Sequence, residues 1–135
     1  MKRQLVISDD PIDEAELIFE RRMSEGMGAV IYFLGVVRKM EGSDSISGID
    51  YEAHHEMAAH QFNLLFDEIE TRWPIESIRL VHRLGVVKVN EPSLWVEVVA
   101  PHRGEAFDAC QWLIEEMKKK VPIWKKPIGR SHNDE

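Results

Sequence analysis

Apolar positions along the chain change their period several times, and each change marks the boundary of an expected element. Apolar residues recur at helical spacing between Glu56 and Arg72, and Pro74 helps to end that helix because proline restricts the residue before it. Helical spacing returns between Arg103 and Lys120. Apolar residues alternate with polar ones, or run together, in the stretches that we expect to be strands: 4–7, 29–37, 49–53, 78–84 and 94–100.

A further helix is expected after the first strand. Asp9 or Asp10 can cap its N-terminus, and Pro11 suits its first position, where a backbone N–H group has no helical partner. Its apolar stripe would consist of Ile12, Ala15, Phe19 and Met23. Residues 26–28, which include two glycines, would end it.

The order of the expected elements predicts the fold class. The almost wholly apolar stretch 29–37 is typical of a central strand covered on both faces, and the polar stretch 41–47 is typical of a loop. A strand, a helix, two strands, a helix, two or three strands, a helix and a short strand follow one another. This order predicts an α+β fold with a mainly antiparallel sheet and three main helices. The 135 residues suit a single domain, 1–135, with its own hydrophobic core.

Composition limits the classes of protein to which the chain can belong. The formal net charge is -7, and no apolar run approaches the ~20 residues that a membrane-spanning helix needs. The acidic balance disfavours a general nucleic-acid binder, which neutralises phosphates with a broad basic surface. The first residues lead into Asp9 and Asp10 rather than into an apolar signal segment. We therefore expect a cytoplasmic protein that binds neither nucleic acid nor a membrane.

Cysteine and histidine positions do not form a metal-site pattern. Cys110 is the only cysteine, so an intramolecular disulfide is impossible and a buried structural thiol is expected. The histidines and the glutamate within 54–60 lack the His-Glu-x-x-His spacing, which favours a polar helix N-terminus over a metal site. His82 shares the face of Leu80 and Leu84 and is expected to be a packed histidine. We expect no metal and no other cofactor.

Five lysines surround an apolar Val-Pro-Ile-Trp core between residues 118 and 126 of this acidic protein. One face of the last helix carries Phe107, Gln111, Ile114 and Lys118. We expect that face to contact the core, where Lys118 would lose hydration and become a nucleophile or a proton carrier. Alternatively, the stem of Lys118 covers the last helical turn while its ammonium group reaches water.

Three further basic residues lie where strands end. Arg38 follows the apolar strand, and His102 and Arg103 stand at the junction of a strand and a helix. Backbone N–H groups at a helix start, an imidazole and a guanidinium can together bind one anion. If the fold brings them to the lysines, they would form a pocket for a small anionic substrate. Exposed ion pairs are the alternative explanation.

Short motifs along the chain resemble those of one known family. They are Gly28-Ala29, Phe33-x-Gly35-x-Val37-Arg38, Tyr51-Glu52, Met57-Ala58, His82-Arg83-x-Gly85, His102-Arg103-x-x-Ala106-Phe107 and Lys118-x-x-Val121-Pro122-Ile123-Trp124-Lys125-Lys126. Their order and spacing resemble the large, catalytic subunit of molybdopterin synthase, from about Leu5 to Lys126. Residues 127–135 form a short divergent tail.

The resemblance implies an α/β hammerhead-type fold and a homodimer formed through the sheet-rich face. Each protomer would bind a small ubiquitin-like sulfur-carrier subunit, which gives a heterotetramer. The carrier's C-terminal Gly-Gly thiocarboxylate would donate sulfur, in two rounds, to cyclic pyranopterin monophosphate and form the dithiolene of molybdopterin. A homodimer would also cover a strand that is apolar on both faces through Leu94, Trp95, Val96, Val98 and Val99.

Matching motif positions also imply roles for single residues. Lys118 and Lys125 would be catalytic. Substrate-binding roles would fall to Arg38, His102, Arg103 and Lys126.

Two departures from the family pattern accompany these matches. Pro127 stands where the family usually has glutamate, and Asn90 stands where a turn glycine is usual. A noncatalytic homologue that docks a ubiquitin-like partner is therefore an alternative function. A stand-alone binder of phosphorylated pterins or nucleotides is another. The retained pocket cations favour the enzyme, because a docking scaffold does not need them.

Overall fold

The computed structural model of the chain describes residues 1–129. Its elements are β1 (Lys2–Ser8), α1 (Glu14–Phe19), β2 (Ala29–Val36), β3 (Met40–Glu41), β4 (Asp44–Ala53), α2 (His55–Arg72), β5 (Ser77–Arg83), β6 (Gly85–Lys88), β7 (Pro92–Ala100), α3 (Arg103–Lys120) and β8 (Ile123–Gly129). Residues 130–135, which complete the divergent tail, lie outside the described part. The expected α+β class, with three helices and mainly antiparallel strand pairing, is confirmed.

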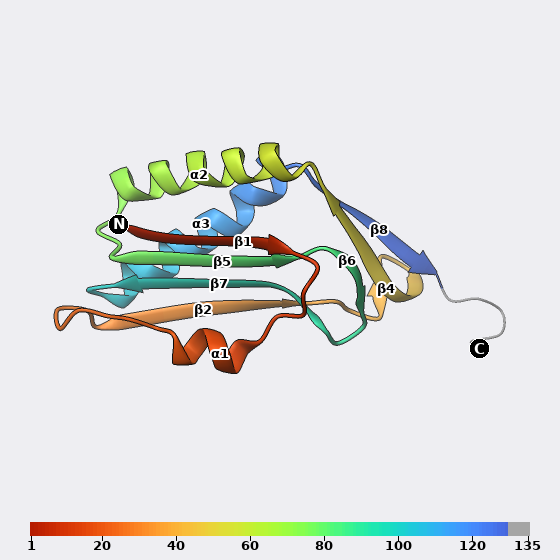
Figure 1. Cartoon of the computed structure of the whole chain (residues 1–135), viewed down its shortest axis with the longest axis horizontal. Coiled ribbons are helices and arrows are strands. Elements are labelled where there is room, and N and C mark those ends of the chain that lie inside the picture. The colour runs from red at the N-terminus through yellow and green to blue at the C-terminus, as the bar shows by residue number, and fades with distance from the viewer. Residues whose placement is uncertain (130–135) are drawn as a thin grey trace.

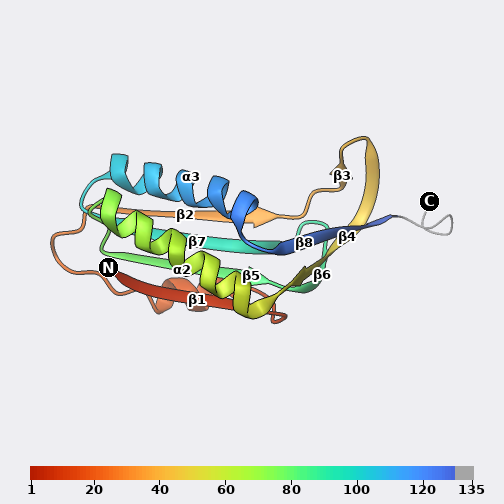
Figure 2. The same cartoon turned by 90° about the horizontal axis from the view of Figure 1, so that it is seen from above.

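The main sheet has the strand order β1-β5-β7-β2. β1 pairs with β5 in parallel, and the other pairs are antiparallel. α2 and α3 lie on one face of this sheet and α1 lies on the other (Figure 1). α3 runs along β2 and β7, whereas α2 reaches β1 (Figure 2). In the described part of the chain, no helix is both long enough and apolar enough to cross a membrane.

A smaller sheet extends beyond one end of the main sheet (Figure 1). Its order is β3-β4-β6, and β8 pairs with β4 on the side that β6 leaves free. This sheet has a small apolar core of its own, formed by Val37, Ile46, Ile49, Tyr51 and Val87. The two sheets and the end of α3 therefore surround a common space.

α2 packs on the main sheet through the stripe that helical periodicity predicts. α2 buries Ala58, Phe62, Leu65, Phe66 and Ile69, as its apolar spacing predicted apart from the addition of Phe66. Full burial of one large apolar side chain contributes about 1.5–3 kcal/mol. α2 ends at Trp73, whose extended backbone precedes Pro74, and His54 caps its start. Both boundaries agree with the sequence prediction to within one residue.

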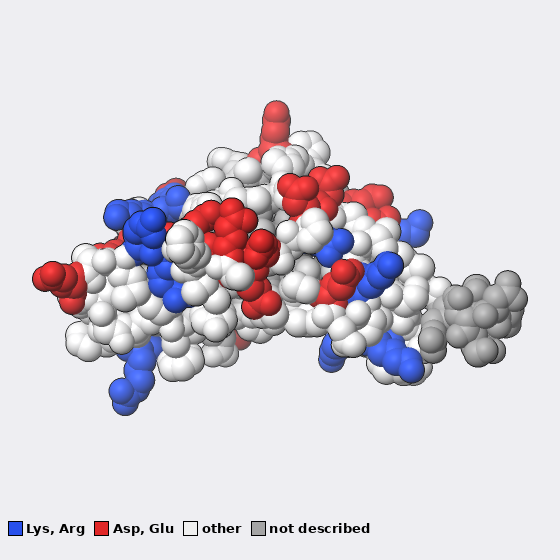
Figure 3. Space-filling view, turned by 60° about the horizontal axis from the view of Figure 1, so that its bottom comes forward, with Lys and Arg blue, Asp and Glu red and all other residues white. Residues whose placement is uncertain are grey.

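The opposite face of the main sheet is closed by the segment 9–27 rather than by a second molecule. Glu97 of β7 is only 1% exposed, and its carboxylate accepts hydrogen bonds from Arg21 (2.6 Å) and Arg79 (2.8 Å). Arg79 also donates to the carbonyl oxygen of Leu17 at 2.7 Å. Lysine and arginine side chains lie beside aspartate and glutamate side chains on this side of the molecule (Figure 3).

This closure means that a homodimer is not needed to cover the apolar strand β7. The strand residues Leu94, Trp95, Val96, Val98 and Val99 are all buried within the single chain. These residues are apolar on both faces of the strand because α2 and α3 cover one face and the α1 segment covers the other. A second copy is not needed to cover them.

The first helix is much shorter than expected. α1 spans Glu14–Phe19, and its cap is Asp13, whose side chain accepts a hydrogen bond from the Glu16 N–H group, so Asp9, Asp10 and Pro11 lie before it. The stripe prediction was wrong here, because Phe19 and Met23 are exposed. The helix ends at Glu20, and the next residue, Arg21, bonds to Glu97 instead of continuing the helix.

Two strand predictions were also wrong in detail. β2 is an edge strand that pairs only with β7, and its Tyr32, Phe33 and Val36 are exposed. An apolar run identifies a strand but not its neighbours, so it could not show that one edge is free. The polar stretch 41–47 is a hairpin between β3 and β4, in which Gly42 adopts a φ of 63°.

Candidate active site

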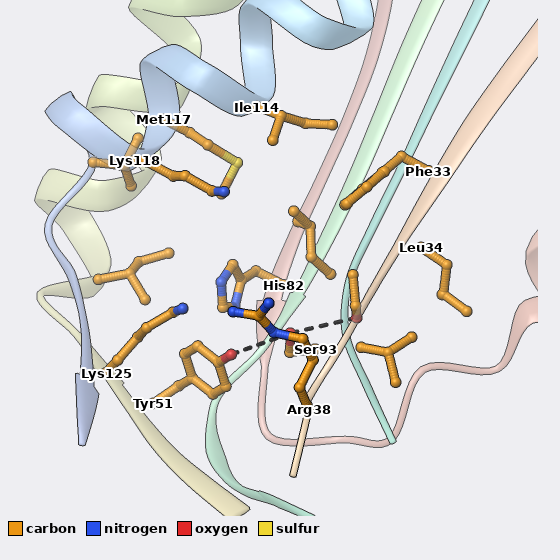
Figure 4. Close-up of a pocket in the computed structure, with 15 residues that line it drawn as sticks. Phe33, Leu34, Arg38, Tyr51, His82, Ser93, Ile114, Met117, Lys118 and Lys125 are labelled. Carbon is orange, nitrogen blue, oxygen red and sulfur yellow. Dashed lines mark hydrogen bonds between the residues drawn. The ribbon is translucent and has the colours of Figure 1, made fainter. Parts of the chain in front are cut away.

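A cavity of about 680 Å³ opens between the two sheets, beside the C-terminal end of α3. Its apolar wall comes mainly from β2, β7 and α3, and includes Phe33, Leu94, Ile114 and Met117. Its polar side groups come from six different segments and are Arg38, Tyr51, His82, Ser93, Lys118 and Lys125. Figure 4 shows Lys118, Lys125 and Arg38 pointing into the space in which the His82 ring also lies. No aspartate or glutamate of residues 1–129 lines this cavity.

Lys118 reaches the cavity from the last turn of α3, although not for the reason expected. The core-facing side of α3 carries Ala106, Ala109, Cys110, Leu113 and Met117. Phe107, on the predicted stripe, is 55% exposed, and Gln111 and Lys118 are exposed as well. The predicted stripe therefore lies on the flank of the helix, because small alanine side chains let the neighbouring face approach the sheet. This flank borders the cavity at its C-terminal end.

Lys125 enters the cavity because of the register of β8. β8 is antiparallel to β4, and Lys125 lies opposite Tyr51 while Lys126 lies opposite Asp50. Side chains alternate between the two faces of a strand, so Lys125 lines the cavity and Lys126 does not. Pro127 continues β8 opposite Ile49, on an edge strand where proline is tolerated.

A hydrogen-bonded chain forms part of the cavity floor. The Tyr51 hydroxyl donates to the Ser93 hydroxyl at 3.3 Å, and the Ser93 hydroxyl donates to the carbonyl oxygen of Gly35 at 3.5 Å (Figure 4). Burial raises the pKa of Tyr51 above its usual value of 10.0, so its hydroxyl keeps its proton near neutral pH. Tyr51 and Ser93 are 42 residues apart, so no local pattern could predict that they meet.

His82 is buried, as its strand position predicted, but it also lines the cavity. Its ring meets the Tyr51 ring edge-on, with the ring centres 5.2 Å apart. Burial lowers the pKa of His82 below 6.5, and the positive charge of Lys125 lowers it further, whereas the carbonyl oxygen of Arg83 opposes both effects. The imidazole is therefore neutral near pH 7. Its place beside Leu80 and Leu84 on one strand face predicted a packed histidine and no role in the site.

His102 and Arg103 lie far from the cavity in the single chain. They stand at the start of α3, and Arg103 precedes Lys118 by about 22 Å of helix at the usual rise per residue. His102 is 81% exposed on its side chain and faces Glu105 at 3.8 Å. Of the residues expected to form one basic pocket, the chain by itself brings together Arg38, Lys118 and Lys125.

Cys110 and His54 lie outside the cavity, in places where they serve the fold. Cys110 is buried, as expected, and burial raises the pKa of its thiol to about 11. His54 caps α2, and its Nδ1 atom accepts a hydrogen bond from the Met57 N–H group at 3.3 Å. Among residues 1–129, no three His, Cys, Asp or Glu side chains form a group that could hold a metal ion.

These features define an α+β protein with a cavity into which cationic side chains point. A family model described as "MoaE protein" matches residues 7–120. The molybdopterin synthase catalytic subunit of Thermoplasma volcanium is 35% identical over 127 residues, which cover 94% of this chain and 92% of the relative. The chain belongs to the MoaE protein family.

Solved structures show the same fold. Molybdopterin synthase from Staphylococcus aureus superimposes with a TM-score of 0.83 and 34% identity, covering 95% of this chain and 91% of that one. A protein–protein complex of subunits 1 and 2 of the molybdopterin-converting factor from Helicobacter pylori contains a chain with a TM-score of 0.74 and 22% identity. The match covers 96% of this chain and 90% of that chain, and at this identity it shows the fold alone.

Proposed function

We propose that this chain transfers sulfur from the C-terminal Gly-Gly thiocarboxylate of a small ubiquitin-like carrier to cyclic pyranopterin monophosphate, forming the dithiolene of molybdopterin. Membership of the MoaE family makes the chain an enzyme of molybdenum cofactor biosynthesis. The observation that carries the detailed proposal is the convergence of Arg38, Lys118 and Lys125 on one cavity that no carboxylate lines. We place the reaction in the cytoplasm and assign it to one domain.

The cavity suits these reactants by size and by charge. Its volume of about 680 Å³ lies within the usual range for small-molecule sites. A cyclic phosphate and a thiocarboxylate are both anions, so they match a wall that carries two ammonium groups and a guanidinium. The fixed donors of Arg38 suit a phosphate, whereas a lysine acts as a point charge that can also move a proton. The apolar wall can accept the pterin ring.

Lys118 and Lys125 are the proposed catalytic residues. They enter the cavity from different elements, α3 and β8, so they can act on different atoms of the reactants. Negative charge develops on the substrate oxygen that sulfur replaces and on the carrier's acyl oxygen. Ammonium groups held near those atoms stabilise that charge, and they can supply a proton to the leaving oxygen.

The carrier subunit is the proposed partner. The Helicobacter pylori relative of known structure is a complex of subunits 1 and 2, which supports a two-subunit assembly. The exposed positions of Lys118 and Lys125 leave the cavity open to an extended tail that enters from the surface. A homologue that only docks the carrier would need no cations in the cavity.

A second copy of the chain is the proposed source of His102 and Arg103. These residues cannot reach the cavity of their own chain, because α3 separates them from Lys118 by about 22 Å. β2 has a free edge, and Tyr32, Phe33 and Val36 on it are exposed, as is Phe107 of α3. A homodimer through this edge would cover these apolar groups and bring the start of α3 toward the partner's cavity. Lys126, which faces away from the cavity, then has no assigned contact with the substrate.

Reconstitution tests the proposed function. The chain is mixed with thiocarboxylated carrier and cyclic pyranopterin monophosphate, and the dithiolene product is measured. Product formation is expected. Carrier binding without product would instead identify a docking scaffold, and binding of the phosphorylated pterin without any carrier requirement would identify a stand-alone binder.

A mixing experiment tests the shared site. Lys118→Ala and Arg103→Ala chains are each expected to be inactive alone, and after exchange of subunits about a quarter of the wild-type activity is expected to return. Recovery occurs because one site in each mixed dimer has both native residues. Lack of recovery, with mixed dimers demonstrated, would show that both residues act in one chain or that Arg103 does not bind substrate.

A further inference from the structure

His82 lines the cavity, and the reaction proposed above does not yet use its chemistry. Its Nδ1 atom lies 2.9 Å from the carbonyl oxygen of Arg83. A carbonyl oxygen only accepts hydrogen bonds, so Nδ1 carries the ring hydrogen and Nε2 keeps its lone pair. Within the described residues, Nε2 forms no hydrogen bond, although the ring lines the cavity. The backbone therefore fixes the tautomer that leaves a free base.

The other charged and titratable groups around His82 are three cations and one hydroxyl group that already donates a hydrogen bond. Lys118 from α3, Lys125 from β8 and Arg38 after β2 carry positive charge, and the Tyr51 hydroxyl of β4 already donates to Ser93. No carboxylate of residues 1–129 lines the cavity. Nε2 of His82 is consequently the only neutral nitrogen base on the wall that the structure describes.

Sulfur transfer needs such a base. A thiocarboxylate sulfur that bonds to the substrate remains bonded to the carrier's acyl carbon, so the two reactants are joined by a thioester. Release of the carrier requires water to cleave the carbon–sulfur bond. The water oxygen becomes a good nucleophile only as it loses a proton.

We propose that Nε2 of His82 accepts a proton from the water molecule that cleaves this thioester, a role that rests on the function proposed above. The water oxygen bonds to the acyl carbon, and the carbon–sulfur bond breaks with its electron pair passing to sulfur. The carrier leaves as a carboxylic acid, and the sulfur stays on the substrate as a thiolate. The imidazolium of His82 then returns the proton to solvent. No oxidant or reductant takes part.

The cationic surroundings support this assignment. Burial lowers the pKa of His82 and the positive charge of Lys125 lowers it further, so the ring is present as the base at neutral pH and loses this form only in acid. The same cations stabilise the negative charge on the acyl oxygen and on the departing sulfur. The cavity thus contains a neutral base, His82, together with cations that stabilise negative charge, and the cations do not protonate the base.

The test compares His82→Asn with His60→Asn. An asparagine side chain can still donate a hydrogen bond to the Arg83 carbonyl oxygen, but its amide nitrogen has no lone pair that accepts a proton. His60 is an exposed residue of α2 outside the cavity, so it receives the same chemical change without a predicted role. Both variants are assayed with thiocarboxylated carrier and cyclic pyranopterin monophosphate, and intact mass is followed through a single turnover.

We expect His82→Asn to lower turnover at least ~100-fold. It should also accumulate a species with the combined mass of carrier and substrate, whereas His60→Asn should match the wild type. Wild-type turnover should fall in acid as His82 becomes protonated, and the residual activity of His82→Asn should lack this dependence. The wild-type pH profile is informative even if His82→Asn does not fold.

Three results would overturn the role of His82. They are wild-type turnover that does not fall at any acidic pH at which the chain stays folded, unchanged turnover in His82→Asn, or loss of turnover in a folded His82→Asn without the joined species. A wild-type chain that forms no product would instead overturn the proposed sulfur transfer, and the role of His82 with it. The two failures are therefore distinguishable.

Discussion

Lys125 of β8 lies directly opposite Tyr51 of β4 in the antiparallel pairing of these strands. This register places Lys125 beside the floor of the cavity and turns Lys126 to the other face. Lys118 reaches the same cavity from the end of α3, which precedes β8 by only two residues. Of the five lysines in the segment 118–126, Lys118 and Lys125 therefore line the cavity, and the other three do not.

The position of each lysine, rather than the total charge of the segment, should decide which lysines are needed for product formation. We expect Lys118→Ala to abolish product formation and Lys125→Ala to lower it at least ~100-fold, the usual effect of losing a positioned proton-transfer group. Lys119→Ala and Lys120→Ala are the matched controls, because both ammonium groups lie near Glu116, at 3.4 and 3.6 Å, outside the cavity. Steady-state product assays, together with carrier-binding measurements, distinguish the variants. If Lys119→Ala were as damaged as Lys118→Ala, the segment would act as a diffuse basic patch.

Glu97 should be important for stability. Its buried carboxylate lies between Arg21 and Arg79, so Glu97→Gln would leave two largely buried guanidinium groups without a counter-ion. Breaking a buried ion pair in this way typically costs about 3–5 kcal/mol. Urea unfolding followed by circular dichroism measures the loss.

The control for Glu97 is an exposed ion pair of similar chemistry. Glu68 faces Arg72 at 3.6 Å on α2, and both side chains are nearly half exposed. Glu68→Gln should change the free energy of unfolding by less than about 0.5 kcal/mol. Equal losses in the two variants would contradict a special role for the buried carboxylate.

Cys110 should be unreactive in the folded protein. Burial raises the pKa of its thiol to about 11, so the reactive thiolate is scarce in the folded state at pH 8. The thiolate fraction should rise only as the pH approaches this value. Iodoacetamide labelling, followed by mass spectrometry, is expected to be slow in the native chain and fast in denaturant. Rapid native labelling at pH 8 would show that the thiol is accessible.

Asn90 adopts a φ of 71°, in the left-handed region. Asparagine and glycine tolerate this conformation, whereas other residues pay about 1–2 kcal/mol for it. Asn90→Gly should therefore stay close to wild type, and Asn90→Ala should lower the melting temperature. A lower stability for Asn90→Gly than for Asn90→Ala would show that the asparagine side chain, rather than the backbone, holds this turn.

The sequence by itself determined the elements whose signal is local. Helical spacing located α2 and α3 to within one residue, because a single stripe of each helix packs on the sheet. Side chains alternate along a strand, so Lys125 and Lys126 lie on opposite faces of β8, and asparagine tolerates the positive φ that Asn90 adopts. The motif resemblance agreed with the family to which the chain belongs. Each of these features depends on residues that are close together in the chain.

Only the tertiary structure decided which distant residues meet. β2 became an edge strand because the order β1-β5-β7-β2 gives it one neighbour, which its apolar sequence could not show. His82 and Arg38 join Lys118 in the cavity because strand order and register bring them there, whereas the length of α3 keeps Arg103 away. Periodicity records the environment of one element, but the site depends on how several elements pack together.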